Sequence, residues 1–324
     1  MKFLVIGDLH LDAGQHLSRT NSLHCQMLKT VLFDIIDKTS ILIDKVIFLG
    51  DIWNNNKPAP QYIDIFTNLV DYIKLRLHCD IVIVSGNHDY AYDGCITTTI
   101  AKLAKKDLIT IEPHQYSIID NIAYVAHGCL LNSIDLSAVN ILFGHFSVAS
   151  MSRTESNYII KTGELFKYLS SIKLSILGDI HKNQQIATNA YHVGTPYPIK
   201  LNDNNDHYYG IVDTDAITWT TYQTIAPRII EANDINYHKY NDPKYIVCLS
   251  TLDMSNIANI QKNLEFAHQV IVLPTMTQND HSAQTDNKIS SLTDEELLSQ
   301  YIKSKYVDTL LLKDAIRIKN EAGI

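Results

Sequence analysis

Three short apolar runs in the first third of the chain are continuous rather than alternating. They are Phe3–Gly7, Lys45–Gly50 and Asp80–Gly86. A strand that is covered on both faces shows a continuous apolar run, whereas a strand with one face in solvent alternates. The three runs therefore predict short, fully buried strands.

Two longer segments between these runs repeat apolar residues every three or four positions. Ser22–Lys38 and Pro60–Leu77 show this spacing, which is typical of amphipathic helices that cover a core. Strands separated by helices of this length are typical of βαβ units.

The following part of the chain contains more strands than helices. Further strands are predicted at Ile118–Asp120, Ile122–Ala126, Asn140–Phe143 and Leu174–Leu177, with a hairpin at Tyr208–Asp213 and Ile217–Thr224. This excess predicts an α/β fold for residues 1–230, a layered β-sandwich flanked by helices.

The pattern restarts after residue 230. Tyr245–Leu249, a helix near Asn256–Ala267 and Gln269–Leu273 form a β-α-β unit, which predicts a small second α/β domain over residues 231–275. Residues 276–291 are mostly polar, as linkers are.

A C-terminal helical segment is expected over residues 292–324. Thr293 and Glu296 form a capping box at its start, and four apolar residues then recur every four positions: Leu298, Ile302, Tyr306 and Leu310. Such a face packs either within the chain or against a partner.

Composition indicates an ordinary globular protein. Of 324 residues, 46% are hydrophobic and 19% are charged. The five cysteines are widely spaced and form no CxxC pair, which favours buried thiols in a reducing compartment. The sequence shows no signal-peptide core and no apolar run that would span a bilayer, so we expect a cytoplasmic protein without membrane attachment.

The formal net charge of −8 argues against a protein that holds nucleic acid by charge alone, since such proteins are usually basic. Two explanations would reconcile this charge with a nuclease. Some carboxylates would be neutralised by bound metal, or another subunit would supply most of the DNA contacts.

Five short polar motifs each follow a predicted strand. They are Asp8-Leu9-His10, Gly50-Asp51, Gly86-Asn87-His88-Asp89, Gly144-His145 and Gly178-Asp179-Ile180-His181. Ligand-binding loops of α/β sheets gather at the carboxyl ends of strands. Mixed imidazole and carboxylate groups suit divalent transition metals. Two such ions roughly 3.5–4 Å apart can clamp a phosphoryl displacement, and they need a carboxylate between them. The series predicts a metal site.

The motif series resembles that of the calcineurin-like metallophosphoesterases over residues 1–230. Within that superfamily, the N-terminal motif, the Gly50-Asp51-Ile52-Trp53 segment and the last motif resemble the Mre11/SbcD/phage gp47 nuclease subunits. The order and size of the later elements resemble the DNA-capping domain and partner-binding region of those subunits.

The resemblance implies a role for each motif residue. Asp8, His10 and His181 would hold one metal, Asn87, His145 and Asp179 would hold the other, and Asp51 would bridge them. His88 would act on the scissile phosphate or the leaving oxygen, and Asp89 would orient His88 by accepting a ring N–H. The cofactors implied are two Mn²⁺ ions, with Mg²⁺ as the alternative.

Two positions depart from the family pattern. Asp179 stands where a histidine is usual, which would shift preference toward harder ions or weaken the second site. Asn54 stands where several members carry a histidine linked to exonuclease action, so the balance of exonuclease and endonuclease action stays open.

Other residues near the motifs have both a functional and a plainer interpretation. Asn54, Lys57 and Lys182 are candidate DNA contacts; Lys57 and Lys182 flank the motif loops and would otherwise be ordinary surface lysines. Trp53 would stack on a base or, more simply, pack in the core. His127 would serve a loop or packing role, as would His78, His114, His192 and His207.

The leading hypothesis is a two-metal DNA nuclease subunit in end processing, repair or recombination, forming a homodimer and acting with an SbcC/Rad50/gp46-like ATPase in a bacterial cell or phage-infected host. The chain has no GxxxxGK[ST] loop, so ATP use would come from the partner. The alternatives are a small-molecule or cyclic-nucleotide phosphodiesterase, a protein phosphatase, and a weakly active assembly subunit, because fold does not fix substrate.

Overall fold

The structure is a computed structural model that describes residues 1–55, 57–90, 108–146, 168–203, 206–233, 236–251 and 257–274. The chain divides into two units, Met1–Leu273 and Pro274–Ile324. The predicted linker and C-terminal helical segment, residues 276–324, lie outside the described residues.

One six-stranded sheet contains the first three predicted strands and is mostly parallel. Its order is β12-β11-β1-β2-β3-β4, and β1 to β4 run parallel while β11 and β12 are antiparallel neighbours. The bounds are β1 Lys2–Ile6, β2 Lys45–Phe48, β3 Asp80–Val84, β4 Leu108–Ile111, β11 Tyr208–Asp213 and β12 Thr218–Gln223.

A second six-stranded sheet faces the first. Its order is β5-β6-β7-β8-β10-β9. The bounds are β5 Tyr116–Ile119, β6 Ile122–Val125, β7 Ile141–His145, β8 Leu174–Gly178, β9 Gln184–Ala187 and β10 Ala190–His192. Side chains of both sheets share one buried cluster, in which the rings of Phe3 and Phe143 lie 6.1 Å apart.

Strand β1 shows why these runs are continuously apolar. Phe3 and Val5 point into the cluster between the sheets, whereas Leu4 and Ile6 point the other way, beneath the helices. Successive side chains of a strand alternate between faces, so a strand that is covered on both sides needs apolar residues throughout.

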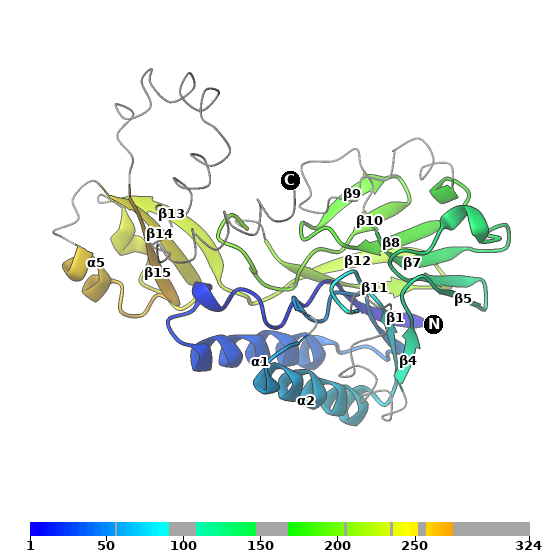
Figure 1. Ribbon diagram of the computed structural model, residues 1–324, viewed down its shortest axis with the longest axis horizontal. Coiled ribbons are helices and arrows are strands. Elements are labelled where there is room, and N and C mark those ends of the chain that lie inside the picture. Colours follow the sequence, from blue (N-terminus) through cyan, green and yellow to red (C-terminus); the bar gives the residue numbers. More distant parts are fainter. Residues whose placement is uncertain are drawn as a thin grey trace, which may run out of the picture. The chain divides into compact units, whose positions relative to one another are not determined.

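Two helices cover the outer face of the first sheet (Figure 1). Helix α1 is Asn21–Lys38 and begins at the N-cap Thr20, whose side chain accepts the Leu23 N–H at 3.1 Å. Helix α2 is Pro60–Leu77, with proline in its first turn, where the missing N–H costs nothing. Both helices match the sequence-based prediction to within one residue.

A three-stranded sheet follows the sandwich, in the order β13-β14-β15. Its elements are β13 Arg228–Asn233, β14 Tyr245–Thr251, helix α5 Ile257–Asn263 and β15 Gln269–Pro274. The predicted β-α-β unit therefore gains a further strand, β13, parallel to β14. This small sheet packs on the segment that follows the first motif, because Leu17 belongs to its buried cluster.

The predicted α/β layered sandwich is confirmed. Four strands were not predicted from the sequence, namely β4, β9, β10 and β13. The free thiols among the described residues are Cys25, Cys79, Cys129 and Cys248. No described helix is both long and apolar enough to cross a membrane.

Candidate metal centre

The five motifs lie at the carboxyl ends of strands of the two sheets, and their side chains come together there. Asp8 follows β1, Asp51 follows β2 and Asn87 follows β3, in three parallel neighbours. His145 ends β7, and Asp179 follows its parallel neighbour β8. Several hydrogen bonds join the sheets here, and two of them involve the backbone beside Asp8 and Asp51. The Asp179 N–H donates to Asp8 Oδ1 at 2.9 Å, and His145 Nδ1 lies 2.6 Å from the Leu49 carbonyl oxygen.

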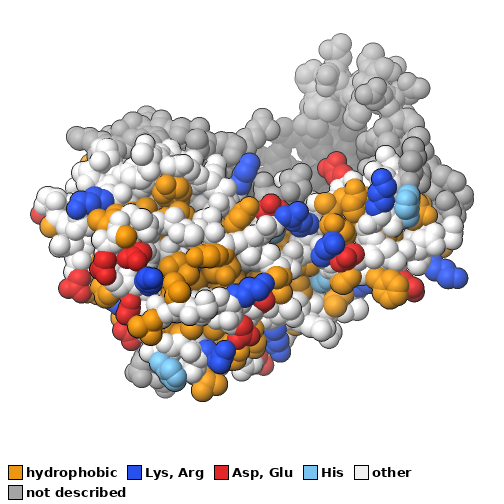
Figure 2. Space-filling view, turned by 180° about the vertical axis from the view of Figure 1, so that it is seen from behind, with side chains coloured by type: hydrophobic (Ala, Val, Ile, Leu, Met, Phe, Trp, Pro, Cys, Tyr) orange, Lys and Arg blue, Asp and Glu red, His pale blue; other side chains and the backbone are white. Residues whose placement is uncertain are grey.

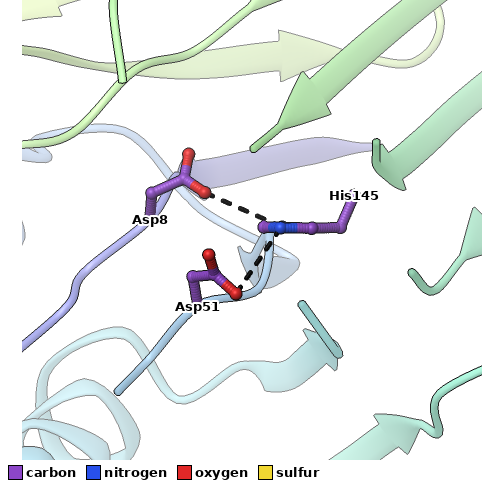
Figure 3. A group of neighbouring side chains, drawn as sticks. All are labelled: Asp8, Asp51 and His145. Carbon is purple, nitrogen blue, oxygen red and sulfur yellow. Dashed lines mark ion pairs between the residues drawn. The ribbon is translucent and has the colours of Figure 1, made fainter. Parts of the chain in front are cut away.

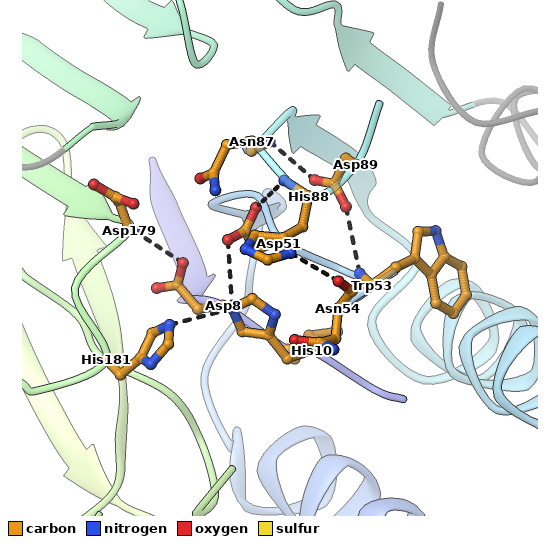
Figure 4. A network of polar contacts seen from close by, with 12 residues as sticks. Asp8, His10, Asp51, Trp53, Asn54, Asn87, His88, Asp89, Asp179 and His181 are labelled. Atoms are coloured by element: carbon orange, nitrogen blue, oxygen red, sulfur yellow. Dashed lines mark hydrogen bonds and ion pairs between the residues drawn. The ribbon is translucent and has the colours of Figure 1, made fainter. Parts of the chain in front are cut away.

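The backbone leaves these strands in a left-handed conformation. Asp8, His10, Asp51 and Asp179 have φ values of 24°, 42°, 48° and 77°. Non-glycine residues adopt positive φ rarely, and Asp, Asn and His do so most readily. The turns direct side chains back over the strand ends, where they converge (Figure 4).

Glycine at position 50 makes room for this convergence. Its φ is 84°, and a Cβ there would collide with the His145 ring. Glycine avoids both the strain of positive φ and the collision. The glycine before Asp51 is thus required by the imidazole that arrives from the opposite sheet.

Asp8, Asp51 and His145 form the buried centre of the site (Figure 3). Each offers one ligand atom, and the three atoms lie within 4.8 Å of one another. His145 Nδ1 is 3.7 Å from Asp8 Oδ1, and His145 Nε2 is 3.5 Å from Asp51 Oδ1. None of these side chains is more than 3% exposed.

His145 is held in one tautomer. A carbonyl oxygen only accepts, so the 2.6 Å contact with Leu49 makes Nδ1 the donor. A metal-ligating histidine is fixed in this way, with the other ring nitrogen free for the metal. Desolvation alone would lower the pKa of His145, but Asp51, Asp8 and Asp179 outweigh it and raise the pKa to about 9. A metal ion bound to Nε2 would compete with a proton for this ring.

The carboxylates in the centre repel one another. Burial raises the pKa of Asp8 well above its ordinary value, and the charges of Asp51 and Asp179 add to that effect. Burial also opposes ionisation of Asp51, but the imidazoles of His145, His10 and His88 prevail and lower its pKa. Several acidic groups buried together fit a site that holds cations.

His10 and His181 face each other across the site. Their Nε2 atoms are 3.2 Å apart, and His10 Nε2 is 3.3 Å from Asp51 Oδ2. Burial lowers the pKa of His10 to about 3 and also lowers that of His181, so both rings are neutral and each has one ring nitrogen with a lone pair. The buried Asp8 Oδ2 has no hydrogen-bond partner among the described residues. Neutral imidazoles and an unpartnered carboxylate oxygen fit divalent cations.

The second predicted group of ligands also comes together. Asn87 Oδ1 lies 3.1 Å from His145 Nε2, and Asp179 Oδ1 lies 3.9 Å from the same nitrogen. Asp51 lies between the groups, because its Oδ2 contacts His10 and its Oδ1 contacts His145. One carboxylate thus reaches a member of each predicted ligand group.

His88 sits beside this centre and contacts it through its backbone and ring. Its N–H donates to Asp51 Oδ1 at 2.9 Å, and its ring is 5.0 Å from that of His10, edge to face. Its Nδ1 is 2.7 Å from the carbonyl oxygen of Asn54. Asn54 thus contacts His88 through its backbone carbonyl, and the DNA contact predicted for Asn54 stays a prediction.

The expected hydrogen bond from His88 to Asp89 was wrong. Asp89 Oδ1 accepts the N–H groups of Ile52 and Trp53 at 2.8 and 3.4 Å, and Oδ2 accepts that of Gly86 at 2.9 Å. The carboxylate is fully buried and turned toward backbone, so it cannot also reach the ring. Burial and the charge of Asp51 raise the pKa of Asp89 to about 7.

The flanking residues divide as follows. Trp53 is fully buried and packs edge-on against Phe66 at 5.7 Å, so it belongs to the core. Lys57 and Lys182 are exposed and form no part of the described contacts of the site. His78 ends α2 in a left-handed conformation.

Sequence reasoning missed one residue near the centre. Asp12 binds the loop after Asp51, and no motif marked it. His127 has the packing contacts that were expected of it: its ring lies 6.1 Å from that of His145, and its Nδ1 is 3.0 Å from the Tyr90 hydroxyl.

One of the comparisons with known proteins, the family match, agrees with this centre. The sequence matches the calcineurin-like phosphoesterase family over residues 1–248. A solved structure of an archaeal phosphodiesterase is similar at 14% identity and a TM-score of 0.37, over 69% of this chain and 99% of that one. A comparison with curated proteins finds no match. The family assignment rests on the sequence match.

Proposed function

The chain belongs to the calcineurin-like phosphoesterase family, a family of metal-dependent hydrolases, and we propose that it is a two-metal nuclease that hydrolyses phosphodiester bonds of DNA. The observation that carries this proposal is the position of Asp51, whose two oxygens contact His10 on one side and His145 on the other. Two-metal phosphoryl transfer needs a carboxylate in that place.

We assign Asp8, His10 and His181 to one ion and Asn87, His145 and Asp179 to the other. Divalent ions held there supply Lewis-acid polarisation of a phosphoryl oxygen and a nucleophile at neutral pH. Leu49 keeps Nε2 of His145 available by accepting from Nδ1. His88 stands outside both groups, where its Nε2 can donate to the phosphate or to the leaving oxygen.

DNA as the substrate is supported by the small sheet of β13, β14 and β15. His268 Nε2 is 2.8 Å from Ser18 Oγ, and Arg19 donates to the Leu264 carbonyl oxygen at 2.7 Å. These contacts hold the sheet on the segment that follows the first motif. An additional module anchored on that segment suits an extended substrate, whereas a small phosphodiester would not need it.

A partner ATPase is proposed from the charge and the C-terminal segment. On the face seen in Figure 2, basic side chains of the described residues are interspersed with acidic ones rather than joined into one patch. The net charge is −8. Because charge dominates non-specific DNA affinity, we infer that an SbcC/Rad50-like ATPase supplies much of the DNA contact.

Hydrolysis of labelled DNA tests the proposed function. We expect Mn²⁺-dependent cleavage of single-stranded or duplex DNA that EDTA abolishes. Parallel assays use cyclic nucleotides and a phosphorylated protein. Hydrolysis of either of these without any cleavage of DNA would overturn the nuclease assignment while keeping the phosphoesterase chemistry.

Mn²⁺ is expected to support hydrolysis several-fold faster than Mg²⁺ at equal concentration. The proposed ligand set mixes three imidazoles with carboxylates, and Mg²⁺ prefers oxygen ligands alone. Initial rates across a titration of each ion, after removal of bound metal by EDTA, give the measurement. Equal or better activity with Mg²⁺ alone would contradict the ligand set.

Deletion of residues 292–324 is expected to abolish co-purification with a partner of the SbcC/Rad50 kind while Mn²⁺-dependent cleavage of single strands persists. The reason is the capped segment with apolar residues every four positions. Ile302→Asp in the full chain should weaken the association in the same way. Unfolding of the truncated chain, seen by circular dichroism, would instead show that the segment belongs to the core.

A further inference from the structure

The loop after Asp51 is held by carboxylates from both sides. Asp89 takes the N–H groups of residues 52 and 53. Asp12 takes the next one, since its Oδ1 accepts the Asn54 N–H at 2.5 Å while its Oδ2 accepts the Asn55 side-chain amide at 2.9 Å. Three consecutive N–H groups therefore end on buried carboxylates.

Asn54, which Asp12 holds in place, in turn contacts the ring of His88. Its carbonyl oxygen lies 2.7 Å from His88 Nδ1 (Figure 4). Because a carbonyl oxygen only accepts, Nδ1 carries the hydrogen. A neutral ring then has its lone pair on Nε2, and a protonated ring has its second N–H there. In both states it is Nε2 that remains for the substrate.

We propose that Asp12 is a positioning residue for His88: through Asn54, it fixes both the orientation and the tautomer of that imidazole. The part of the proposal that concerns catalysis rests on the proposed role of His88 in phosphodiester hydrolysis. The part that concerns the tautomer rests on the contacts alone.

The contacts distinguish this role from general loop packing. The two loops are already paired by backbone hydrogen bonds, His10 N–H to the Asp51 carbonyl at 2.8 Å and Leu11 N–H to that of Ile52 at 3.0 Å. The backbone pairing stops at Ile52. Beyond it, the two carboxylate oxygens of Asp12 accept hydrogen bonds from Asn54 and Asn55. Removing Asp12 would release the carbonyl that holds His88 while the pairing up to residue 52 remains.

Steady-state kinetics of Asp12→Ala and Asp12→Asn test the catalytic part, with bis(p-nitrophenyl) phosphate and Mn²⁺. We expect Asp12→Ala to lower kcat about 10- to 100-fold, since a small misplacement of a catalytic group has effects of that order, with KM and metal content unchanged. Asp12→Asn keeps an acceptor oxygen for the Asn54 N–H and should recover most of the rate. Asp44→Ala is the matched control, because Asp44 also accepts a backbone N–H, from Lys2 at the far end of β1.

A double-mutant cycle with His88→Ala separates positioning from loss of structure. If Asp12 acts through His88, Asp12→Ala will have no further effect on kcat once His88 is absent. The same fold-loss in both backgrounds, or loss of bound metal in Asp12→Ala, would overturn the proposal.

The tautomer of His88 can be read without any activity. Long-range ¹H–¹⁵N spectra of the full-length protein, with the His88 signals identified by their loss in His88→Gln, should show a neutral ring protonated at Nδ1. Asp12→Ala should shift the ring to the Nε2-protonated form or a mixture, and Asp12→Asn should not. An unchanged tautomer in Asp12→Ala would refute the positioning proposal, whatever the substrate is. Failure to hydrolyse any phosphodiester would refute only the proposed function.

Discussion

Asp51→Ala is expected to remove bound metal and to lower the rate of phosphodiester hydrolysis by more than about 10⁴-fold. Asp51 is the carboxylate that contacts both His10 and His145. On the proposed assignment Asp51 would hold both ions, so its loss would remove the electrostatic stabilisation that the ions would supply to the attacking and leaving oxygens. Such an effect exceeds that of losing a single acid–base group.

Elemental analysis beside the nuclease rate checks this expectation. Asp51→Asn keeps the size of the side chain and tolerates the φ of 48°, so its loss of metal would report charge rather than backbone strain. Asp135→Ala removes an exposed carboxylate that contacts Ser137 and should change nothing. If Asp51→Ala retained two ions per chain, the bridging assignment would be wrong.

His88→Ala is expected to lower kcat about 10²–10⁴-fold while both ions stay in place. The range is that of losing one acid–base or charge-stabilising group. His88 follows the proposed ligand Asn87 on the same turn, but its Nδ1 is committed to the Asn54 carbonyl. On the proposed assignment its other ring nitrogen, Nε2, would act on the substrate and not as a metal ligand.

The measurement again pairs metal content with turnover. His78→Gly is a suitable control, because it removes an imidazole at a helix end whose φ of 51° glycine adopts freely. Loss of metal from His88→Ala as complete as that from Asp51→Ala would make His88 a ligand, and the division of roles would fail.

The central strands and both long helices could be predicted from their hydrophobic patterns. A strand that is buried on both faces is apolar throughout, and a helix that is buried on one face repeats apolar residues every three or four positions. Strands β1, β2 and β3 are continuous apolar runs, and α1 and α2 repeat every three or four residues. Strand β9 has two polar residues followed by two apolar ones, and β10 has only three residues, so neither carries a periodic signal. Pairing with neighbouring strands determines them instead.

The site divides in a similar way. Ligand candidates could be found in the sequence because each follows a strand and has a metal-binding side chain. The hydrogen bonds of Asp89 could not, since its neighbour in sequence, His88, is not its partner in space. Asp12 was missed for the same reason: its role exists only because the loop after β1 runs beside the loop after β2.

The left-handed backbone at Asp8, His10, Asp51 and Asp179 restricts how this centre can be altered by mutation or evolution. Exchange of one ligand for another must draw on residues that tolerate positive φ, namely Asp, Asn, His and glycine. Glutamate has a longer side chain and would also be strained at positive φ. β-Branched residues would be strained most at positive φ. Asp179 itself belongs to this short set of residue types. Glycine would relieve the backbone strain at each of these positions but would remove the side chain that we assign to a metal, and at Asp8 and Asp51 also the acceptor of a backbone N–H. On the proposed assignment, backbone strain and turnover therefore make opposite demands at these four residues.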